Sequence, residues 1–254
     1  MFEMSKTILI IRKADEFSKI LAANGFEIIN LPLIETKPLA DLSNFEAKLE
    51  NINDYDGIFL TSRNAARIFA EKSSEKNINF SGKVYVLGKK SLEILKSSHL
   101  NLHYDKQANT AREMLESIAS EDLKDRKFLF IRGDKSLRVL PDFLRHQAVA
   151  DETIVYETHE IQIEISKRQL IAAKFGSGEI AATVLFSPSA AQSFLAQFGT
   201  EILHQTVIAA IGKTTADFFE RQNLRVGFVS SKSNSEVFAG ELTEYVKNRT
   251  MDNG

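Results

Sequence analysis

Hydroxyl side chains recur in this sequence where an apolar run gives way to a predicted helix. They are, in chain order, Thr61, Ser62, Ser91, Ser187, Ser189, Thr214 and Thr215. At such a junction the first backbone amides of the helix lack partners and the helix dipole is positive, so a phosphate or carboxylate is attracted. Ser and Thr are also the preferred residues for ordinary helix capping. One junction alone indicates capping, but four at matching places favour a ligand.

Two arginines and one tyrosine stand at the ends of predicted strands. Arg12 and Arg132 follow apolar runs, and a guanidinium can bind a carboxylate through two hydrogen bonds. A structural ion pair with a neighbouring Asp or Glu is an equally good interpretation. Tyr156 ends the run 152–156, and its phenol can act as a general acid or a hydrogen-bond donor. Simple packing is the alternative for this tyrosine.

Missing motifs exclude several kinds of site. The chain has no Cys, which excludes disulfides, Cys-ligated metals and a Cys nucleophile. The Gly-Lys pairs at 88–89 and 212–213 lack the earlier glycine of a P-loop, and no GxGxxG follows the first predicted strand. His99 and His103 alone have metal-ligand spacing, and we interpret them as surface residues. We therefore expect neither a metal nor a cofactor.

Length and composition indicate a globular protein. The 254 residues are 43% hydrophobic and 26% charged, which are ordinary values and suggest one to two domains. The formal net charge of −2 gives no sign of binding to nucleic acid or to a membrane. The apolar run 7–11 is too short for a signal peptide or a membrane span. We expect a cytoplasmic monomer.

Apolar patterns alternate between the periods of strands and helices along the whole chain. The predicted strands are 7–12, 26–31, 57–60, 83–87, 101–104, 127–131, 152–156, 182–186, 207–211 and 225–229. The predicted helices are 14–24, 42–51, 64–72, 90–97, 110–119, 137–147, 164–175, 189–198, 214–222 and 235–246. This alternation predicts parallel sheet. Two doubly wound α/β domains fit it better than one open sheet, and a closed eight-fold barrel is the alternative.

An internal repeat supports two domains. Residues 61–66 match 186–191 at a distance of 125 residues, and 86–91 match 210–215 at a distance of 124 residues. Strand-turn-helix units in general look alike, which is the alternative explanation. Matches in the same order at a nearly constant distance favour a duplication.

These motifs together resemble the uroporphyrinogen-III synthase family over about residues 6–246. The resemblance rests on Arg12, Gly25, Pro32-Leu33-Ile34, LTSRNA (60–65), VLGKKS (86–91), Arg132-Gly133, VYET (155–158), FSPSA (186–190) and AIGKTTA (210–216). Ser91, where Thr is commoner, and Arg63 depart from the family pattern. Both departures leave the carboxylate pattern of the site open.

The resemblance implies two flavodoxin-like, doubly wound parallel-sheet domains joined by a two-stranded antiparallel linker. One domain would combine 1–34 with 164–248, and the other would be 39–156. The linker strands would be 33–38 and 157–163, and 249–254 would be a frayed tail.

The resemblance also implies an activity. A linear tetrapyrrole polycarboxylate, hydroxymethylbilane, would be cyclised with inversion of its terminal pyrrole ring and loss of water, in tetrapyrrole (haem) biosynthesis. The main task of such an enzyme, a hydro-lyase that needs no cofactor, is to hold the substrate in the reactive geometry. Tyr156 falls on the family's strand-end tyrosine, the catalytic candidate. Ser62, Ser91, Ser187, Thr214 and Thr215 fall on its substrate-binding positions, which we extend by position to Arg12, Thr61, Arg132 and Ser189.

Two other functions remain open from the residues alone. Helix N-termini suit phosphate as well as carboxylate, so an enzyme acting on a phosphorylated small molecule is one. A ligand-binding or sensor module, as a degenerate member of the family, is the other. Fold by itself does not choose among them.

Overall fold

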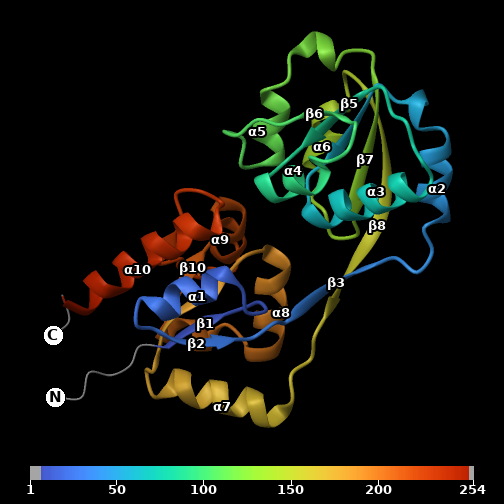
Figure 1. Ribbon diagram of the computed structural model, residues 1–254. Helices are drawn as coiled ribbons and strands as arrows, with labels where there is room; N and C mark the ends of the chain where they lie inside the picture. The colour runs from blue at the N-terminus through green and yellow to red at the C-terminus, as the bar shows by residue number, and fades with distance from the viewer. Residues whose placement is uncertain (1–6, 252–254) are drawn as a thin grey trace. The chain divides into compact units, whose positions relative to one another are not determined.

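The computed structural model describes residues 7–251. Contacts divide this part of the chain into two compact units (Figure 1). Unit 1 takes the segments up to Glu35 and from Glu160 onward, and unit 2 is Thr36–His159. Each unit has its own sheet, so the closed barrel is excluded. Among the described helices, none combines the length and the apolar character needed to cross a bilayer.

Unit 1 contains a five-stranded sheet of order β11-β10-β9-β1-β2, and its paired strands run parallel. The strands are β1 (Thr7–Ile10), β2 (Glu27–Asn30), β9 (Ile180–Leu185), β10 (Val207–Ala210) and β11 (Phe228–Val229). The helices are α1 (Glu16–Ala23), α7 (Ile165–Gly176), α8 (Pro188–Phe198), α9 (Lys213–Glu220) and α10 (Ser235–Met251), with a 3-10 turn η3 (Glu201–Gln205).

Both faces of the unit 1 sheet are covered, which explains the continuous apolar runs of its strands. Ile8 and Ile10 face α1 and α10, which lie side by side (Figure 1). Leu9 and Ile11 belong to the opposite core, built with α7, α8 and α9. The chain has 18 Phe and no Trp, and Phe fills both cores. These buried rings include Phe17, Phe238, Phe175, Phe194 and Phe219.

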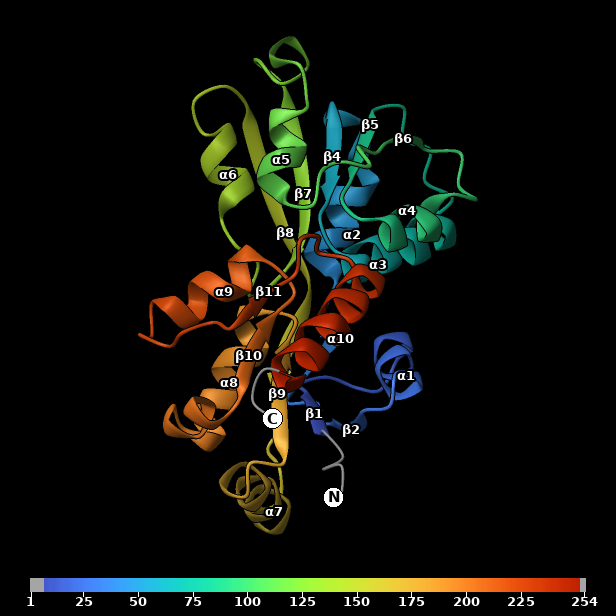
Figure 2. The same cartoon turned by 90° about the vertical axis from the view of Figure 1, so that its left-hand side faces the viewer.

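Unit 2 is built on a six-stranded sheet of order β3-β8-β7-β4-β5-β6. Its strands are β3 (Ile34–Pro38), β4 (Gly57–Leu60), β5 (Lys83–Val86), β6 (Asn101–His103), β7 (Lys127–Gly133) and β8 (Val149–Glu160). Its helices are α2 (Ser43–Glu50), α3 (Arg63–Glu75), α4 (Lys89–Leu95), α5 (Ala111–Glu116) and α6 (Val139–Leu144), with 3-10 turns η1 (Ile52–Asp54) and η2 (Ser120–Asp122). One core packs against α2, α3 and α4, and the other against α5 and α6 (Figure 2).

The strand order reverses once in each sheet. In unit 1 the reversal lies between β1 and β9, and in unit 2 between β4 and β7. The helices that follow these two strands, α1 and α8 or α3 and α6, pack on opposite faces of their sheet. Such divergence opens a crevice at the carboxyl ends of the strands, where ligands of open parallel sheets bind.

Several predicted boundaries differ from the structure. The predicted strand 152–156 and part of the extended stretch 157–163 form a single strand, β8. The predicted strand 225–229 is reduced to Phe228–Val229. Helix α10 continues to Met251, beyond its predicted end at 246. Apolar spacing marks only the part of a helix that packs on a core, whereas Lys247, Asn248 and Arg249 are exposed. Arg249 Nη1 donates to the Tyr245 hydroxyl at 3.4 Å.

The segments around β3 and the end of β8 are bonded to each other within each unit. In unit 1 the Ile161 amide donates to the Leu33 carbonyl at 2.8 Å, and in unit 2 the Leu39 amide donates to the Val155 carbonyl at 3.0 Å. The antiparallel linker expected from the resemblance stays a prediction.

Candidate active site

Two serine-capped helices stand beside the strand-order reversals, one in each unit. Ser187 precedes α8 and Ser62 precedes α3, both with extended backbone. Ser187 Oγ accepts from the Ala190 amide at 3.2 Å, and Ser62 Oγ accepts from the Ala65 amide at 3.1 Å. The two halves of the sequence repeat therefore form the same local structure. The Ser62 hydroxyl keeps its own hydrogen to donate to an anion, and the Ser187 hydroxyl can also exchange a hydrogen bond with Ser189.

Neighbouring hydroxyls extend these two junctions. Ser189 lies in the first turn of α8, two residues after Ser187, and its Oγ is 3.2 Å from Ser187 Oγ. Thr61 lies between β4 and the cap residue Ser62, and it is partly exposed. Both fall at the carboxyl edge of their own sheet, as the sequence predicts. Uncharged hydroxyl and amide donors gathered at such an edge suit a carboxylate or phosphate.

Arg12 follows β1 at the reversal of unit 1. Its guanidinium carbon lies 3.5 Å from the centroid of the Phe186 ring, and an ion pair joins it to Asp15. Phe186 directly precedes the cap residue Ser187, so Arg12 is placed beside α8 by a cation–π contact. Its side chain is 24% exposed. Arg12 thus has the structural ion pair that the sequence left as one interpretation, and it lies at the predicted edge. A substrate-binding role for Arg12 stays a prediction.

The second pair of repeated junctions is built on glycine caps. Gly88 precedes α4 with φ of +85°, whereas Gly212 precedes α9 with extended backbone. Neither offers a side-chain acceptor to the first turn. Ser91 and Thr215 are each 3% exposed, while Thr214 is exposed. The structure therefore presents the Thr214 hydroxyl to solvent and turns the hydroxyls of the other two residues toward the protein interior.

Arg132 is held by neighbouring groups of unit 2. Its Nε donates to Glu152 Oε2 at 2.6 Å, and its Nη1 donates to the Gly133 carbonyl at 2.8 Å. The side chain is 15% exposed. This is the structural ion pair that the sequence left as an alternative, made across the β7–β8 ladder. A substrate-binding role for Arg132 stays a prediction.

Tyr156 lies on β8 opposite Gly133, the last residue of β7. Its ring is partly buried against the core that contains α3. No described residue forms a hydrogen bond with its hydroxyl. The phenol is therefore fixed by packing, with its polar end available to a ligand at the carboxyl edge of β7. This arrangement suits a proton or hydrogen-bond donor.

One hydroxyl at the carboxyl edge of the unit 1 sheet was missed in the sequence. The loop 230–234 follows β11, and Ser233 Oγ lies so close to Gly212 that a Cβ on that glycine would approach it to 2.7 Å. Ser233 thus stands at the N-terminus of α9. Glu241 shapes the loop by accepting from the Ser230 hydroxyl and the Ser231 amide, both at 3.0 Å. The serine-rich stretch 230–235 after a predicted strand was the available signal.

The described residues of both edges offer donors and no paired acid and base. Within residues 7–251, no group of three or more His, Asp or Glu side chains is arranged to hold a metal ion. Each edge offers donors to anionic groups, and the edge of unit 2 adds one polar donor, Tyr156. Such donors, without a paired acid and base, suit a reaction whose outcome depends on the conformation in which the substrate is held.

Comparison with known proteins places the chain in a family. The family model described as uroporphyrinogen-III synthase HemD matches residues 15–239. The chain is 26% identical over 253 residues to the uroporphyrinogen-III synthase of Chlorobaculum parvum, covering 95% of this chain and 100% of that protein. It is 24% identical over 225 residues to the porphyrin biosynthesis protein HemD of Ruminiclostridium josui, covering 87% of this chain and 44% of that longer protein.

Solved structures of low sequence identity share the fold. A mutant uroporphyrinogen III synthase from Thermus thermophilus has a TM-score of 0.67 at 12% identity, covering 96% of this chain and 100% of that one. Uroporphyrinogen-III synthetase from Helicobacter pylori has a TM-score of 0.59 at 17% identity, covering 95% and 100%. These likenesses agree with two parallel-sheet α/β domains.

Proposed function

The chain belongs to the uroporphyrinogen-III synthase family, and from this premise we infer that it is a uroporphyrinogen-III synthase of porphyrin biosynthesis. We propose that it cyclises hydroxymethylbilane. The C–O bond of the terminal hydroxymethyl group breaks, and the hydroxyl leaves as water after taking up a proton. The terminal pyrrole ring is inverted through a spiro intermediate, and ring closure returns a proton to solvent, so the net change is loss of one water.

The observation that carries this proposal is the pair of serine-capped helices, at Ser62 and Ser187, beside the strand-order reversals. The substrate is a flexible polycarboxylate. Hydroxyls and first-turn amides bind carboxylates without a net positive charge, which fits a chain of formal charge −2. Thr61, Ser189, Thr214 and Arg12 add donors at the same edges.

Control of conformation is the main catalytic contribution that we propose. Unassisted closure of the linear substrate gives the type I isomer, without ring inversion. Carboxylate arms held by such donors would keep the terminal ring in the geometry for the inverted attack. The Tyr156 hydroxyl would donate to the leaving hydroxyl, because this phenol has no hydrogen-bond partner among the described residues.

Product analysis tests the proposal directly. The purified protein is incubated with freshly made hydroxymethylbilane, the products are oxidised, and the uroporphyrin isomers are separated beside a control without protein. We expect a dominant type III peak. A type I pattern equal to the control, from protein shown to be folded by circular dichroism, would contradict synthase activity and favour a ligand-binding or sensor role. We further propose a monomeric, cytoplasmic enzyme, which sedimentation and cell fractionation would check.

A further inference from the structure

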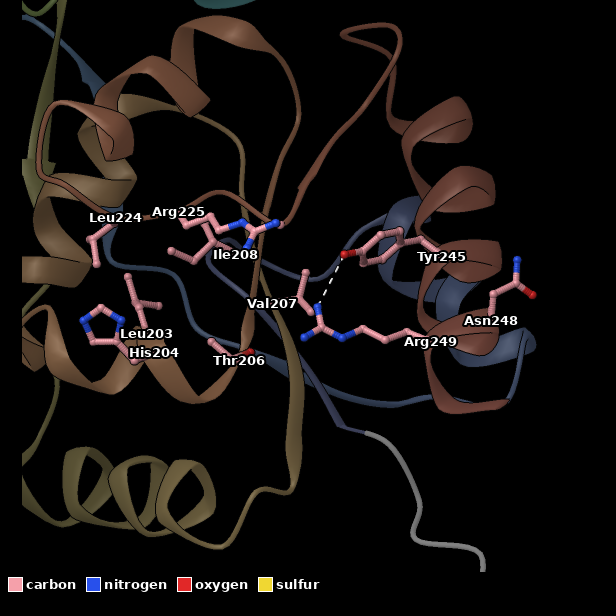
Figure 3. Close-up of a pocket in the computed structure, with 11 residues that line it drawn as sticks. Leu203, His204, Thr206, Val207, Ile208, Leu224, Arg225, Tyr245, Asn248 and Arg249 are labelled. Carbon is pink, nitrogen blue, oxygen red and sulfur yellow. Dashed lines mark hydrogen bonds between the residues drawn. The ribbon is translucent and has the colours of Figure 1, made fainter. Parts of the chain in front are cut away.

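A cavity of about 660 Å³ lies in unit 1 at the amino ends of the strands. Its walls come from η3 and the start of β10, from the segment before β11, and from the last turns of α10 (Figure 3). Strand β10 begins in this cavity at Val207 and ends at Ala210, before the α9 junction. Four strand residues span about 13 Å. The cavity is therefore at the opposite edge of the sheet from the candidate active site.

Cationic and neutral residues line the cavity, and no Asp or Glu is among its lining residues. Arg225 comes from the segment before β11, and Arg249 comes from α10. Arg249 Nη1 donates to the Tyr245 hydroxyl at 3.4 Å. Arg225 has neither an ion pair nor a side-chain hydrogen bond with any described residue. Two guanidinium groups on one concave surface raise the local positive potential, although the whole chain is slightly acidic.

Gly227 brings the two walls together. A Cβ on this glycine would lie 3.0 Å from Val207 Cγ1 and 3.7 Å from the Tyr245 hydroxyl oxygen. The segment 225–227 therefore passes within van der Waals reach of Tyr245. Because Gly227 has no side chain, the space between this segment and Tyr245 stays open. Figure 3 shows the side chains of Tyr245 and Arg249 reaching from α10 toward Val207, with the Arg225 side chain on the other side of Val207 near Ile208.

Buried hydrophobic side chains lie beneath the floor of the cavity. Its four hydrophobic lining residues are Leu203, Val207, Ile208 and Leu224. The volume falls in the range of small-molecule sites. Arginine binds phosphate and carboxylate groups through two parallel hydrogen bonds. Guanidinium groups and a phenol ring also stack on aromatic rings, so Arg225, Arg249 and Tyr245 together suit an anionic group carried on an aromatic ring.

We propose that this cavity binds a small organic anion, a phosphate or carboxylate attached to an apolar ring, as a second site distinct from the active site. Tyr245 and Arg249 lie beyond residues 15–239, the part matched by the family model. The proposal therefore depends on residues of this chain outside the family match. It does not depend on the synthase activity.

Calorimetric titration with phenyl phosphate and with benzoate tests the proposal. Phenol, which is neutral, and inorganic phosphate, which has no ring, serve as the two control compounds. We expect the two aromatic anions to bind at least about tenfold more tightly than either control compound, because phenol lacks the anionic group and inorganic phosphate lacks the ring. The tighter of the two anions identifies the preferred group. Absence of binding by both at millimolar concentration would overturn the proposal.

Variants locate the bound probe. Arg225→Gln combined with Arg249→Gln should weaken binding by about tenfold or more. Both arginines are exposed, so folding should be kept. Arg221→Gln, an exposed arginine outside the lining residues, should leave binding unchanged. Undiminished binding by the double variant, or loss of binding in Ser187→Ala at the opposite edge, would contradict the proposed location.

A fluorescent reporter gives an independent measurement. The chain contains no Trp, so Tyr245→Trp introduces a single indole at the cavity. We expect the fluorescence emission of this indole to change on addition of phenyl phosphate, with the same concentration dependence as the heat released in the calorimetric titration. A binding heat without any change in the emission of the indole would place the bound probe outside this cavity and overturn the proposal.

Discussion

The Tyr156 ring lies directly against the Cα of Gly133, its partner across the β7–β8 ladder. A Cβ on residue 133 would lie 2.3 Å from Tyr156 Cε2 and 2.8 Å from the phenol oxygen. Contacts this short are not tolerated in a packed interior. The missing side chain at 133 therefore allows the phenol to occupy its place at the end of β7.

Gly133→Ala should displace the Tyr156 ring. We expect a loss of stability of about 1–3 kcal/mol from overpacking and a fall in kcat of at least about tenfold from the misplaced donor. Chemical unfolding and steady-state kinetics measure the two effects. Gly176→Ala is the control, because a Cβ there meets no atom within 4 Å. Full activity of a folded Gly133→Ala protein would show that the position of the phenol does not matter.

Tyr156→Phe should slow turnover and leave product binding nearly unchanged. Loss of a proton or hydrogen-bond donor in the transition state corresponds to roughly a hundredfold in kcat. Tyr85→Phe is the control, since Tyr85 is 1% exposed within the core and has no access to substrate. Measured kcat and product Kd separate the effects. Equal losses in both quantities would contradict a role for Tyr156 in assisting the leaving hydroxyl.

Two substitutions separate the capping role of the Ser187 hydroxyl from the binding role that we propose for it. Ser187→Ala should cost about 1 kcal/mol of stability, because the Ala190 amide loses its acceptor. Ser187→Gly is tolerated at a cap with only a few tenths of that loss, yet it also removes the hydroxyl. We therefore expect Ser187→Gly to raise KM by about threefold to tenfold while thermal unfolding stays near wild type. An unchanged KM would leave Ser187 only its capping role.

Gln197 should stabilise unit 1 through its side-chain amide. Its Nε2 donates to the Ile161 carbonyl at 3.0 Å, and its Oε1 accepts from the Ile163 amide at 3.1 Å. Gln197→Leu leaves both main-chain groups unpaired, and we expect a loss of about 1–3 kcal/mol in urea unfolding. Gln197→Glu keeps the acceptor and should lose less. Hydrogen exchange at Ile163 should accelerate in the leucine variant, and unchanged exchange would count against this role.

Glu241 should make stability depend on pH. Hydrogen bonds from Ser231, first its hydroxyl and then its amide, hold the pKa of Glu241 below the usual value of 4.5. A carboxyl whose pKa is lower in the folded state stabilises the protein above its unfolded pKa, and the effect is lost as pH falls through the folded pKa.

Glu241→Gln should therefore lower Tm at neutral pH. The difference from wild type should shrink as the pH falls below the usual value of 4.5. Thermal scans of both proteins between neutral and acid pH measure it. A difference that is independent of pH would mean that the charge of Glu241 has no part in stabilising the loop 230–234.

Local chemistry made much of this protein predictable from its sequence. Ser62 and Ser187 were identifiable because a cap acts on an amide three residues further along, a distance that helix geometry sets. The alternation of apolar patterns likewise indicated parallel sheets with helices on both faces, since periodicity reflects which side of an element is buried.

Contacts across the ladder were decided only by the tertiary structure. Glu152 lies 20 residues from Arg132 in sequence, and strand register brings the two into an ion pair. The same register sets Tyr156 against Gly133. Burial of Ser91 and Thr215, beside an exposed Thr214, depends on how each helix packs. Register and packing arise from many distant side chains together, whereas caps and turns depend on a few neighbours, and for this reason the sequence indicates where hydroxyls gather but not which of them a ligand can reach.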